Sequence, residues 1–281
     1  MQDNRETSRH RRAYGAVLAL ALATAGTAPA FAASTEPVPN SMAALGDSIT
    51  RGFLDCNKIA DCPMESWSTG VDPAVDSQYR RILKINPAIN GQRYNLAASG
   101  SKVADIQAQA TAAVADGVDY LTILIGANDA CAATVADMTQ VSTFRAAFAQ
   151  ALDGISTGLP NARIFVASIP DLYRLWQLAS PIPQARSVWK LASICQSMLA
   201  DPLSMKPADM ARRQAVLQRV IDYNTQLGAE CALHAHCKFD HNTVFNHTFS
   251  LSDIGTIDYF HPSIPGQAAL AKGTWRAGFG W

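Results

Sequence analysis

Short runs of apolar residues recur along the chain, and each ends at a glycine, a proline or a polar turn. These runs show little alternation between apolar and polar residues, which predicts buried strands of a parallel sheet. The clearest are SMAALGDS (41–48), RYNLAASG (93–100), DYLTILIGAND (119–129) and NARIFVASIP (161–170). The short run TVFN (243–246) is a candidate for one last strand.

Segments with helical spacing separate these strands. In residues 101–117, Val103, Ile106 and Ala110 repeat on one helix face, and Gly117 gives a plausible stop. Similar patterns predict helices at 141–158, 207–231 and 263–278. Strands alternating with helices predict the α/β class, with a central parallel sheet covered by helices on both faces.

The regular alternation breaks at residues 171–207. This segment contains two tryptophans and several prolines, so it is expected to be an insertion over the sheet rather than another strand–helix unit. Its residues Trp176, Trp189, Leu175, Leu178 and Leu191 form either an apolar wall for an acyl chain or an ordinary small core. No internal repeat or linker is present, and a single domain over 33–281 is expected.

The first 32 residues have the pattern of a signal peptide. A basic start with four arginines precedes the apolar run AVLALALATAG, which is too short to span a bilayer. The small residues Ala30 and Ala32 fit the site that a signal peptidase cuts, so cleavage after Ala32 and secretion are expected. A retained membrane anchor is the alternative.

The cysteine count supports export. An even number of cysteines in an exported chain predicts disulfides, although six cysteines allow fifteen pairings. The most economical set is Cys56–Cys62, Cys131–Cys195 and Cys231–Cys237. The formal net charge of zero and the 48% hydrophobic content are those of a globular domain, and nothing in them indicates a nucleic-acid partner.

The ends of the first three predicted strands carry chemically useful groups. Ser48, Gly100 and Asn128 follow these strands, and ligands of open parallel sheets bind at this edge. Far downstream, Asp258 and His261 are spaced so that a single turn can bring them together. A serine needs a base such as imidazole to become a nucleophile, and a carboxylate on the other ring nitrogen orients that base.

The four segments containing these residues are GDS (46–48), NLAASG (95–100), GAND (126–129) and DYFH (258–261). They resemble, in order, the four sequence blocks of the SGNH/GDSL hydrolase superfamily, and the resemblance extends from Met42 to the C-terminus. It implies a flavodoxin-like three-layer α/β/α sandwich and hydrolysis of esters. It also implies Ser48 as nucleophile, with His261 as base and Asp258 as its partner. Gly100, Asn128 and the Ser48 amide would form the oxyanion hole.

Each group also has a simpler interpretation. Ser48 suits the N-cap of a helix. GISTG (154–158) matches the nucleophile elbow of other hydrolases, but a predicted helix precedes it, so Ser156 is expected in a helix-ending turn. The histidines His234, His236, His241 and His247 suggest zinc, yet a polar loop held by a disulfide is the preferred interpretation, and no metal is expected.

The sequence therefore predicts a secreted serine esterase or lipase that acts on a small-molecule or lipid ester and needs no cofactor. A transient contact with a lipid surface fits this activity, and no obligate protein partner is inferred. A carbohydrate esterase that removes acetyl groups from a polysaccharide is one alternative. A secreted binding module without catalysis is the other.

Overall fold

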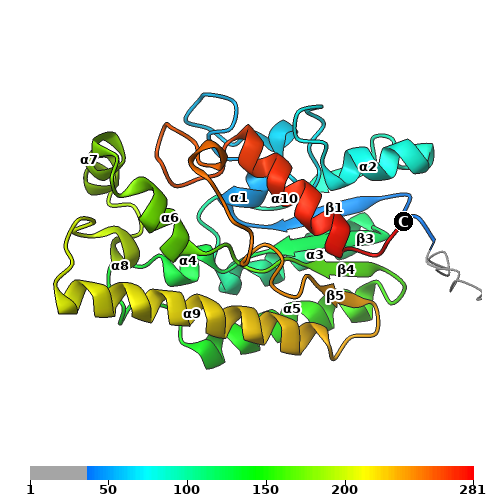
Figure 1. The fold of residues 1–281 in the computed structure, drawn as a ribbon. Coiled ribbons are helices and arrows are strands. Elements are labelled where there is room, and N and C mark those ends of the chain that lie inside the picture. The colour runs from blue at the N-terminus through cyan, green and yellow to red at the C-terminus, as the bar shows by residue number, and fades with distance from the viewer. Residues whose placement is uncertain (1–36) are drawn as a thin grey trace, which may run out of the picture. The chain divides into compact units, whose positions relative to one another are not determined.

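The computed structural model describes residues 37–281, which form one compact unit around a five-stranded parallel sheet (Figure 1). The strand order is β2-β1-β3-β4-β5. The strands are β1 (Met42–Gly46), β2 (Arg93–Asn95), β3 (Tyr120–Leu124), β4 (Arg163–Val166) and β5 (Cys237–Phe239). The predicted signal peptide lies outside the described residues.

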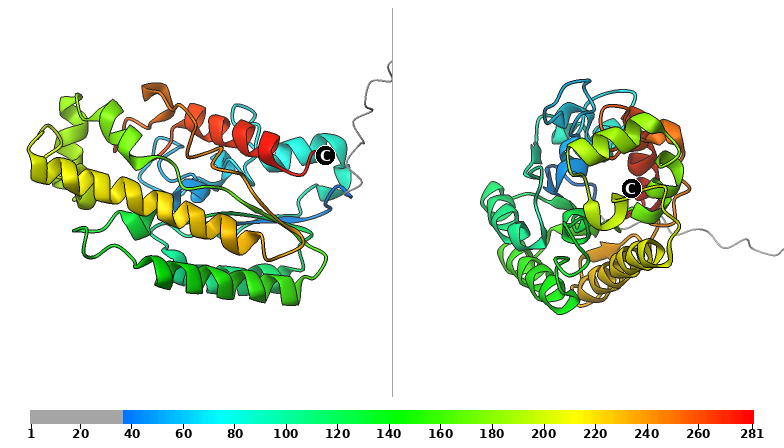
Figure 2. Two further views of the ribbon diagram at one scale, coloured as in Figure 1. Left: turned by 60° about the horizontal axis from the view of Figure 1, so that its bottom comes forward. Right: turned by 90° about the vertical axis from the view of Figure 1, so that its left-hand side faces the viewer.

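Buried strands form the centre of this sheet. Every residue of β1, β3 and β4 is buried, as expected for strands that are covered on both faces. Figure 2 shows α10 and α2 on one side of the sheet and α3 and α5 on the other, which is the predicted three-layer arrangement. The long helices are α2 (Gln78–Ile85), α3 (Ile106–Asp116), α5 (Val141–Gly158), α9 (Pro207–Cys231) and α10 (Ile264–Ala277).

The predicted helices at 141–158, 207–231 and 263–278 match α5, α9 and α10 within a residue or two. The helix expected at 101–117 begins later, at Ile106, after a short 3₁₀ turn at Val103–Asp105, and Gly117 caps its end in the left-handed conformation. None of the helices in the described part of the chain is long and apolar enough to cross a membrane.

The prediction of a strand at 243–246 is wrong. These residues form a turn, and the last strand is instead Cys237–Phe239. The side chain of Asp240 fixes that turn, because its carboxylate accepts hydrogen bonds from the amides of Asn242 and Val244. Backbone amides that donate to a nearby side chain in this way are not available to pair with a neighbouring strand.

The segment 171–207 forms an insertion, as expected, and it is helical. It contains α6 (Leu172–Ala179), α7 (Pro183–Leu191) and α8 (Gln196–Leu199), which extend beyond the sheet at one end of the molecule (Figure 1). Asp171 caps α6 through the amides of Tyr173 and Arg174, and Pro183 begins α7. Proline starts a helix here because the first helical amide needs no partner within the helix.

All three predicted disulfides are present. Cys56–Cys62 and Cys231–Cys237 close short loops, and Cys131–Cys195 joins the segment after β3 to the insertion. The described residues contain no free cysteine.

Candidate active site

Ser48 lies where β1 ends and the one-turn helix α1 (Ser48–Arg51) begins. The N-cap is Asp47, whose Oδ1 accepts a hydrogen bond of 2.9 Å from the amide of Ile49. The simpler interpretation of Ser48 as the cap is therefore wrong. Ser48 is left in the first turn, with its hydroxyl free to contact other groups.

Only a glycine fits without a steric clash at position 46, just before this turn. Gly46 has φ +146°, and a Cβ at this position would lie 2.2 Å from the carbonyl oxygen of Leu124 on the neighbouring strand. The side chain of Gln109 in α3 also holds this peptide, because it accepts from the Gly46 amide at 2.7 Å and donates to the Gly46 carbonyl at 2.9 Å. The position of Ser48 is thus set by β1, β3 and α3 together.

A tight turn brings Asp258 and His261 together, as their spacing predicted. Asp258 Oδ1 accepts hydrogen bonds from the amides of Phe260 and His261, at 3.0 and 3.1 Å. Tyr259, which follows Asp258, adopts φ +54°, a left-handed conformation that non-glycine residues rarely take. The insertion contacts this turn, since the indole of Trp189 in α7 donates to the Tyr259 carbonyl at 3.2 Å.

One line of hydrogen bonds joins Asp258, His261 and Ser48. His261 Nδ1 lies 2.6 Å from Asp258 Oδ2, and His261 Nε2 lies 2.8 Å from Ser48 Oγ. A carboxylate partner requires the proton on Nδ1, which leaves Nε2 as the acceptor for the Ser48 hydroxyl. This is the geometry of a serine with its general base and the group that orients the base.

Asp258 remains ionised in this arrangement. Burial acts to raise its pKa, but the hydrogen bond and charge of His261, together with the two backbone amides, hold that pKa below its ordinary value. The carboxylate is therefore available to stabilise an imidazolium on His261.

Three hydrogen-bond donors belong to residues that follow β1, β2 and β3, at the carboxyl edge of the sheet. The Ser48 amide is in the first turn of α1, where amides have no partner within the helix. Gly100 follows β2 with φ +85°, and Asn128 is in α4 (Ala127–Ala130), directly after β3. One N–H of the Asn128 amide donates to the Ser101 carbonyl at 3.0 Å, which orients the side chain and leaves its second N–H for a ligand.

The predicted site residues meet in one open cleft of about 620 Å³. Ser48, Gly100, Asn128, Asp258 and His261 all line it. Its remaining walls are mostly apolar and come from the loop after α1, from the end of α7 and from the segment before His261. These lining residues include Phe53, Leu54, Ile59, Val188, Ala192, Ile194 and Ile257.

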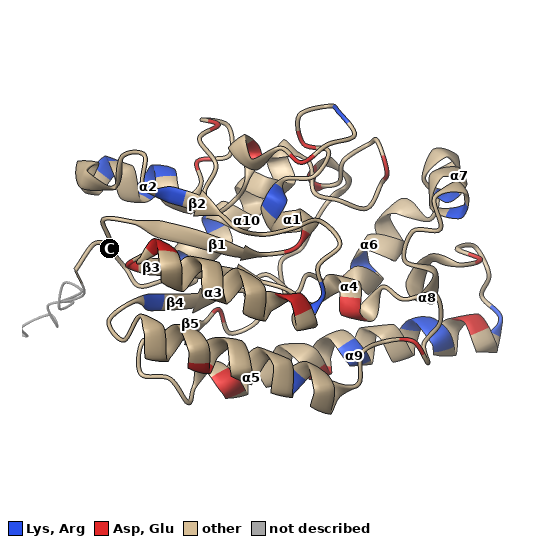
Figure 3. Cartoon of the chain, turned by 180° about the vertical axis from the view of Figure 1, so that it is seen from behind, with Lys and Arg blue, Asp and Glu red and all other residues tan. Residues whose placement is uncertain are grey.

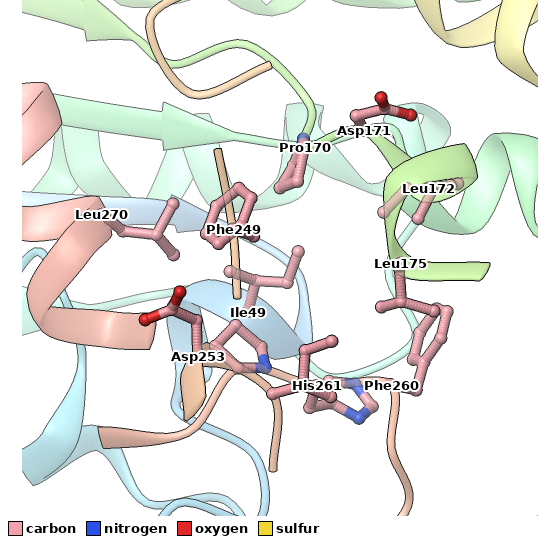
Figure 4. Close-up of a pocket in the computed structure, with 13 residues that line it drawn as sticks. Ile49, Pro170, Asp171, Leu172, Leu175, Phe249, Asp253, Phe260, His261 and Leu270 are labelled. Carbon is pink, nitrogen blue, oxygen red and sulfur yellow. The ribbon is translucent and has the colours of Figure 1, made fainter. Parts of the chain in front are cut away.

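A second, smaller pocket of about 60 Å³ lies on another side of His261 (Figure 4). Leu175, Phe249 and Phe260 point into it, together with Ile49 and the ring of His261. Ser48 does not line this pocket, so the larger cleft is the one that gives access to the hydroxyl.

The apolar residues expected to form an acyl wall divide between several roles. Trp176 and Trp189 are core residues, and the indole of Trp176 donates to the Pro202 carbonyl. Leu175 lines the smaller pocket, whereas Leu191 is 90% exposed. The insertion does line the cleft, but it does so through Val188, Ala192 and Ile194, which the sequence did not single out.

Ser156 and the four histidines of 234–247 do not line the cleft. Ser156 is in the last turn of α5, where its hydroxyl lies 3.0 Å from His234 Nδ1. His234 also lies 3.7 Å from Asp153, and His247 contacts Phe249. Within residues 37–281, no group of three or more His, Cys, Asp or Glu side chains is arranged to hold a metal ion.

Sequence reasoning missed two residues that support the site. Asp61, in the loop closed by Cys56–Cys62, lies 3.1 Å from Arg51 of α1 and accepts a hydrogen bond from the hydroxyl of Ser99, next to Gly100. Gln267 in α10 donates to the Ile49 carbonyl and to Asp55, at 2.8 and 2.9 Å. Both link segments that are distant in sequence, so no local pattern indicates them.

Two buried acids close to the serine carry no strong positive partner. Burial raises the pKa of Asp47 to about 7, and its Oδ2 has no hydrogen-bond partner. Burial also raises the pKa of Asp129, whose Oδ2 accepts from the amide of Val103. This contact anchors the start of the segment that leads into α3.

Comparison with known proteins gives a family match over most of the chain. The family model for GDSL-like lipases and acylhydrolases matches residues 42–274. No curated protein matches the chain by sequence.

Several solved structures share the fold. The structure of TesA superposes with a TM-score of 0.50 and 15% identity, covering 84% of this chain and 97% of that one. An extracellular lipase from Streptomyces rimosus gives 0.48 and 19%, covering 85% and 99%. A family two carbohydrate esterase from Clostridium thermocellum, in complex with cellohexaose, gives 0.50 and 14%, covering 84% and 62%. At these identities the likeness concerns the fold alone.

Proposed function

Because this chain belongs to the GDSL-like lipase/acylhydrolase family, we propose that it is a serine ester hydrolase with Ser48 as its nucleophile. The observation that carries the proposal is the line of hydrogen bonds from Asp258 through His261 to the Ser48 hydroxyl, at 2.6 and 2.8 Å. A non-catalytic binding module has no need for this arrangement together with three donors at the same edge of the sheet.

In the first half of the proposed reaction, Ser48 Oγ attacks the carbonyl carbon of the ester while His261 Nε2 takes its proton. The negative charge on the former carbonyl oxygen is stabilised by the Ser48 and Gly100 amides and by the Asn128 side chain. The tetrahedral intermediate then collapses, the bond to the alcohol oxygen breaks, and His261 gives its proton to the leaving alkoxide. The acyl group remains on Ser48.

In the second half, water takes the place of the alcohol. His261 accepts a proton from the water as the water oxygen attacks the acyl carbon, and it then returns that proton to Ser48 Oγ as the acid is released. Asp258 stabilises the imidazolium in both halves. All groups in these steps belong to the chain itself, and the proposed reaction needs no cofactor.

The cleft supports an apolar ester as substrate. Eight of the residues that line it are apolar side chains from three separate segments, and they meet in the cleft that Ser48 lines. Burial of an acyl chain against such a surface is favourable by about 0.8 kcal/mol for each buried CH₂ group. A lipid or simple acyl ester therefore fits the cleft better than a sugar, which needs polar partners.

We also propose that the protein is exported. The three disulfides support folding in an oxidising compartment, as in secreted proteins. The predicted signal peptide, residues 1–32, would direct this export.

The test is hydrolysis of p-nitrophenyl esters, from acetyl to palmitoyl, by the wild type and by Ser48→Ala. We expect activity that the substitution lowers by at least about 10⁴-fold. Asp258→Asn, which keeps the side-chain shape, should also lower the rate strongly, whereas Ser156→Ala should not. A preference for medium or long acyl chains would support the lipid ester. A strict preference for acetyl, with release of acetate from an acetylated polysaccharide, would favour the carbohydrate esterase instead.

If the wild type and Ser48→Ala are equally inactive on all of these esters, the hydrolase proposal is refuted.

A further inference from the structure

The two most exposed large apolar side chains in residues 37–281 belong to segments that line the cleft. Leu191 is 90% exposed and Ile59 is 85% exposed. Ile59 lines the cleft from the loop 52–62, and Leu191 ends α7, next to Ala192 and one turn after Val188, which line it too. Ile257, 36% exposed, lines the cleft from a third segment. We call Ile59, Leu191 and Ile257 the mouth patch.

A single exposed leucine needs no explanation, but this arrangement does. Ile59 and Ile257 line the apolar cleft from two segments, and Leu191 ends the helix whose residue Val188, with the following Ala192, lines it from a third. Exposed apolar patches next to a functional cleft mark interaction sites. The Cys56–Cys62 disulfide closes the loop that carries Ile59, so this side chain is presented on a short, constrained segment.

The charges beside the mouth patch are basic. An exposed lysine directly precedes each of its two most exposed members, Lys58 before Ile59 and Lys190 before Leu191. Figure 3 shows basic positions and no acidic ones on α7. Of the acidic groups close to Ile59 and Ile257 in sequence, Asp55 is buried and accepts from Gln267, Asp61 pairs with Arg51, and Asp258 pairs with His261. Apolar tips flanked by lysines fit the surface of a lipid layer that carries negative charge.

We propose that the mouth patch docks this protein on an anionic lipid surface. Ile59 and Leu191 enter the boundary between head groups and acyl chains, while the ammonium groups of Lys58 and Lys190 contact lipid phosphates. Docked in this way, the cleft opens toward the lipid, and the acyl chain of an ester can pass from the layer to Ser48 without crossing water. This inference rests on the proposed ester hydrolase function.

The test measures binding to vesicles made of ether-linked phospholipids, which contain no ester to cleave. Vesicles of phosphatidylcholine alone are compared with vesicles that also contain phosphatidylglycerol, by co-sedimentation at low and high salt. The variants are Ile59→Ser, Leu191→Ser and the pair Lys58→Gln with Lys190→Gln. All are prepared from the same host, and mass spectrometry checks that they share one N-terminus.

Leu233→Ser is the matched control, because Leu233 is 70% exposed but lies near the amino ends of the strands. It follows α9, close to His236, whose carbonyl accepts from the amide of Ile164 at the start of β4. The cleft lies instead at the carboxyl ends of the strands.

We expect wild-type protein to bind the anionic vesicles, and each of Ile59→Ser and Leu191→Ser to weaken binding about tenfold or more. The lysine pair should weaken binding to anionic vesicles only, and more so at low salt. Leu233→Ser should bind like the wild type. Leu191→Ser should keep its rate on a dissolved short-chain ester while losing rate on vesicles of ester lipids.

Absence of vesicle binding by the wild type, or an equal loss in Leu233→Ser, would overturn the docking surface while leaving ester hydrolysis intact. A dimer in light scattering that Leu191→Ser dissociates would assign the patch to a second copy of the chain and also overturn it. Failure of the proposed function looks different, because the wild type would then hydrolyse no dissolved ester at all.

Discussion

The disulfide Cys131–Cys195 is predicted to stabilise the fold more than either of the other two. It joins residues 64 apart, whereas Cys231–Cys237 joins residues six apart. A cross-link lowers the entropy of the unfolded chain by an amount that grows with the logarithm of the loop length. This relation gives about 4 kcal/mol for the long loop and about 2.4 kcal/mol for the short one, near room temperature.

Hydrogen bonds also hold together the two segments that this disulfide joins. Ser197 donates from its amide to the Ala132 carbonyl at 2.9 Å and from its hydroxyl to the Ala130 carbonyl at 2.8 Å. These bonds hold the insertion against the segment after Asn128 when the sulfurs are removed. Most of the loss in the double alanine variant should therefore come from the unfolded chain, which becomes free to expand.

The assay is urea unfolding followed by tryptophan fluorescence, for the wild type and for the double variants Cys131→Ala/Cys195→Ala and Cys231→Ala/Cys237→Ala. The free energy of unfolding should fall by about 4 kcal/mol in the first and about 2.4 kcal/mol in the second. The dependence of that free energy on urea should steepen more in the first, because a longer segment becomes free in the unfolded state. Equal losses in the two variants would refute the loop-entropy reasoning.

Three further predictions concern the site. Asn128→Ala should lower kcat by about 10²–10³ with little change in KM, since it removes a donor that acts in the transition state; a change confined to KM would contradict this. Asp61→Asn should lower kcat by about tenfold with under about 1 kcal/mol lost in unfolding, because its contacts to Arg51 and Ser99 position the Gly100 loop; an unchanged kcat would show that this contact has no positioning role. Burial raises the pKa of Asp47 from 3.8 to about 7. Between these two pH values the folded state binds more protons than the unfolded state, so the free energy of unfolding falls as the pH rises toward 7. Asp47→Asn should therefore gain about 3 kcal/mol over the wild type between about pH 5 and pH 8 in urea unfolding, and a constant difference would contradict it.

Local chemistry determined which parts of the fold could be predicted. The helices α5 and α9 carry long periodic patterns and clear starts, and β3 is a continuous buried run, so their positions follow from the sequence. The short strand β5 has only three half-buried residues and no alternation long enough to detect. The prolines in 171–207 marked the end of the regular strand–helix alternation but not the helices inside the insertion, one of which begins at Pro183.

The same distinction applies to the site. Asp258 and His261 are three residues apart, and their pairing needs only a turn, so spacing alone could predict it. Ser48, Gly100 and Asn128 each follow a parallel strand, and parallel strands place their carboxyl ends along one edge. The contact between His261 and Ser48 spans 213 residues, and only the family pattern could indicate it from sequence.

The residues that hold this site together are less visible in sequence than the reactive ones, for a physical reason. Reactive groups must be of particular types, whereas a support needs only a donor or acceptor at the right place. Trp189 supports the turn of His261 through the Tyr259 carbonyl, and Asp61 links α1 to the Gly100 loop. Both supports come from segments that also carry the mouth patch, the insertion and the loop 52–62. In the proposed docked state, the segments that meet the lipid are therefore the same ones that contact the His261 turn and the Gly100 loop.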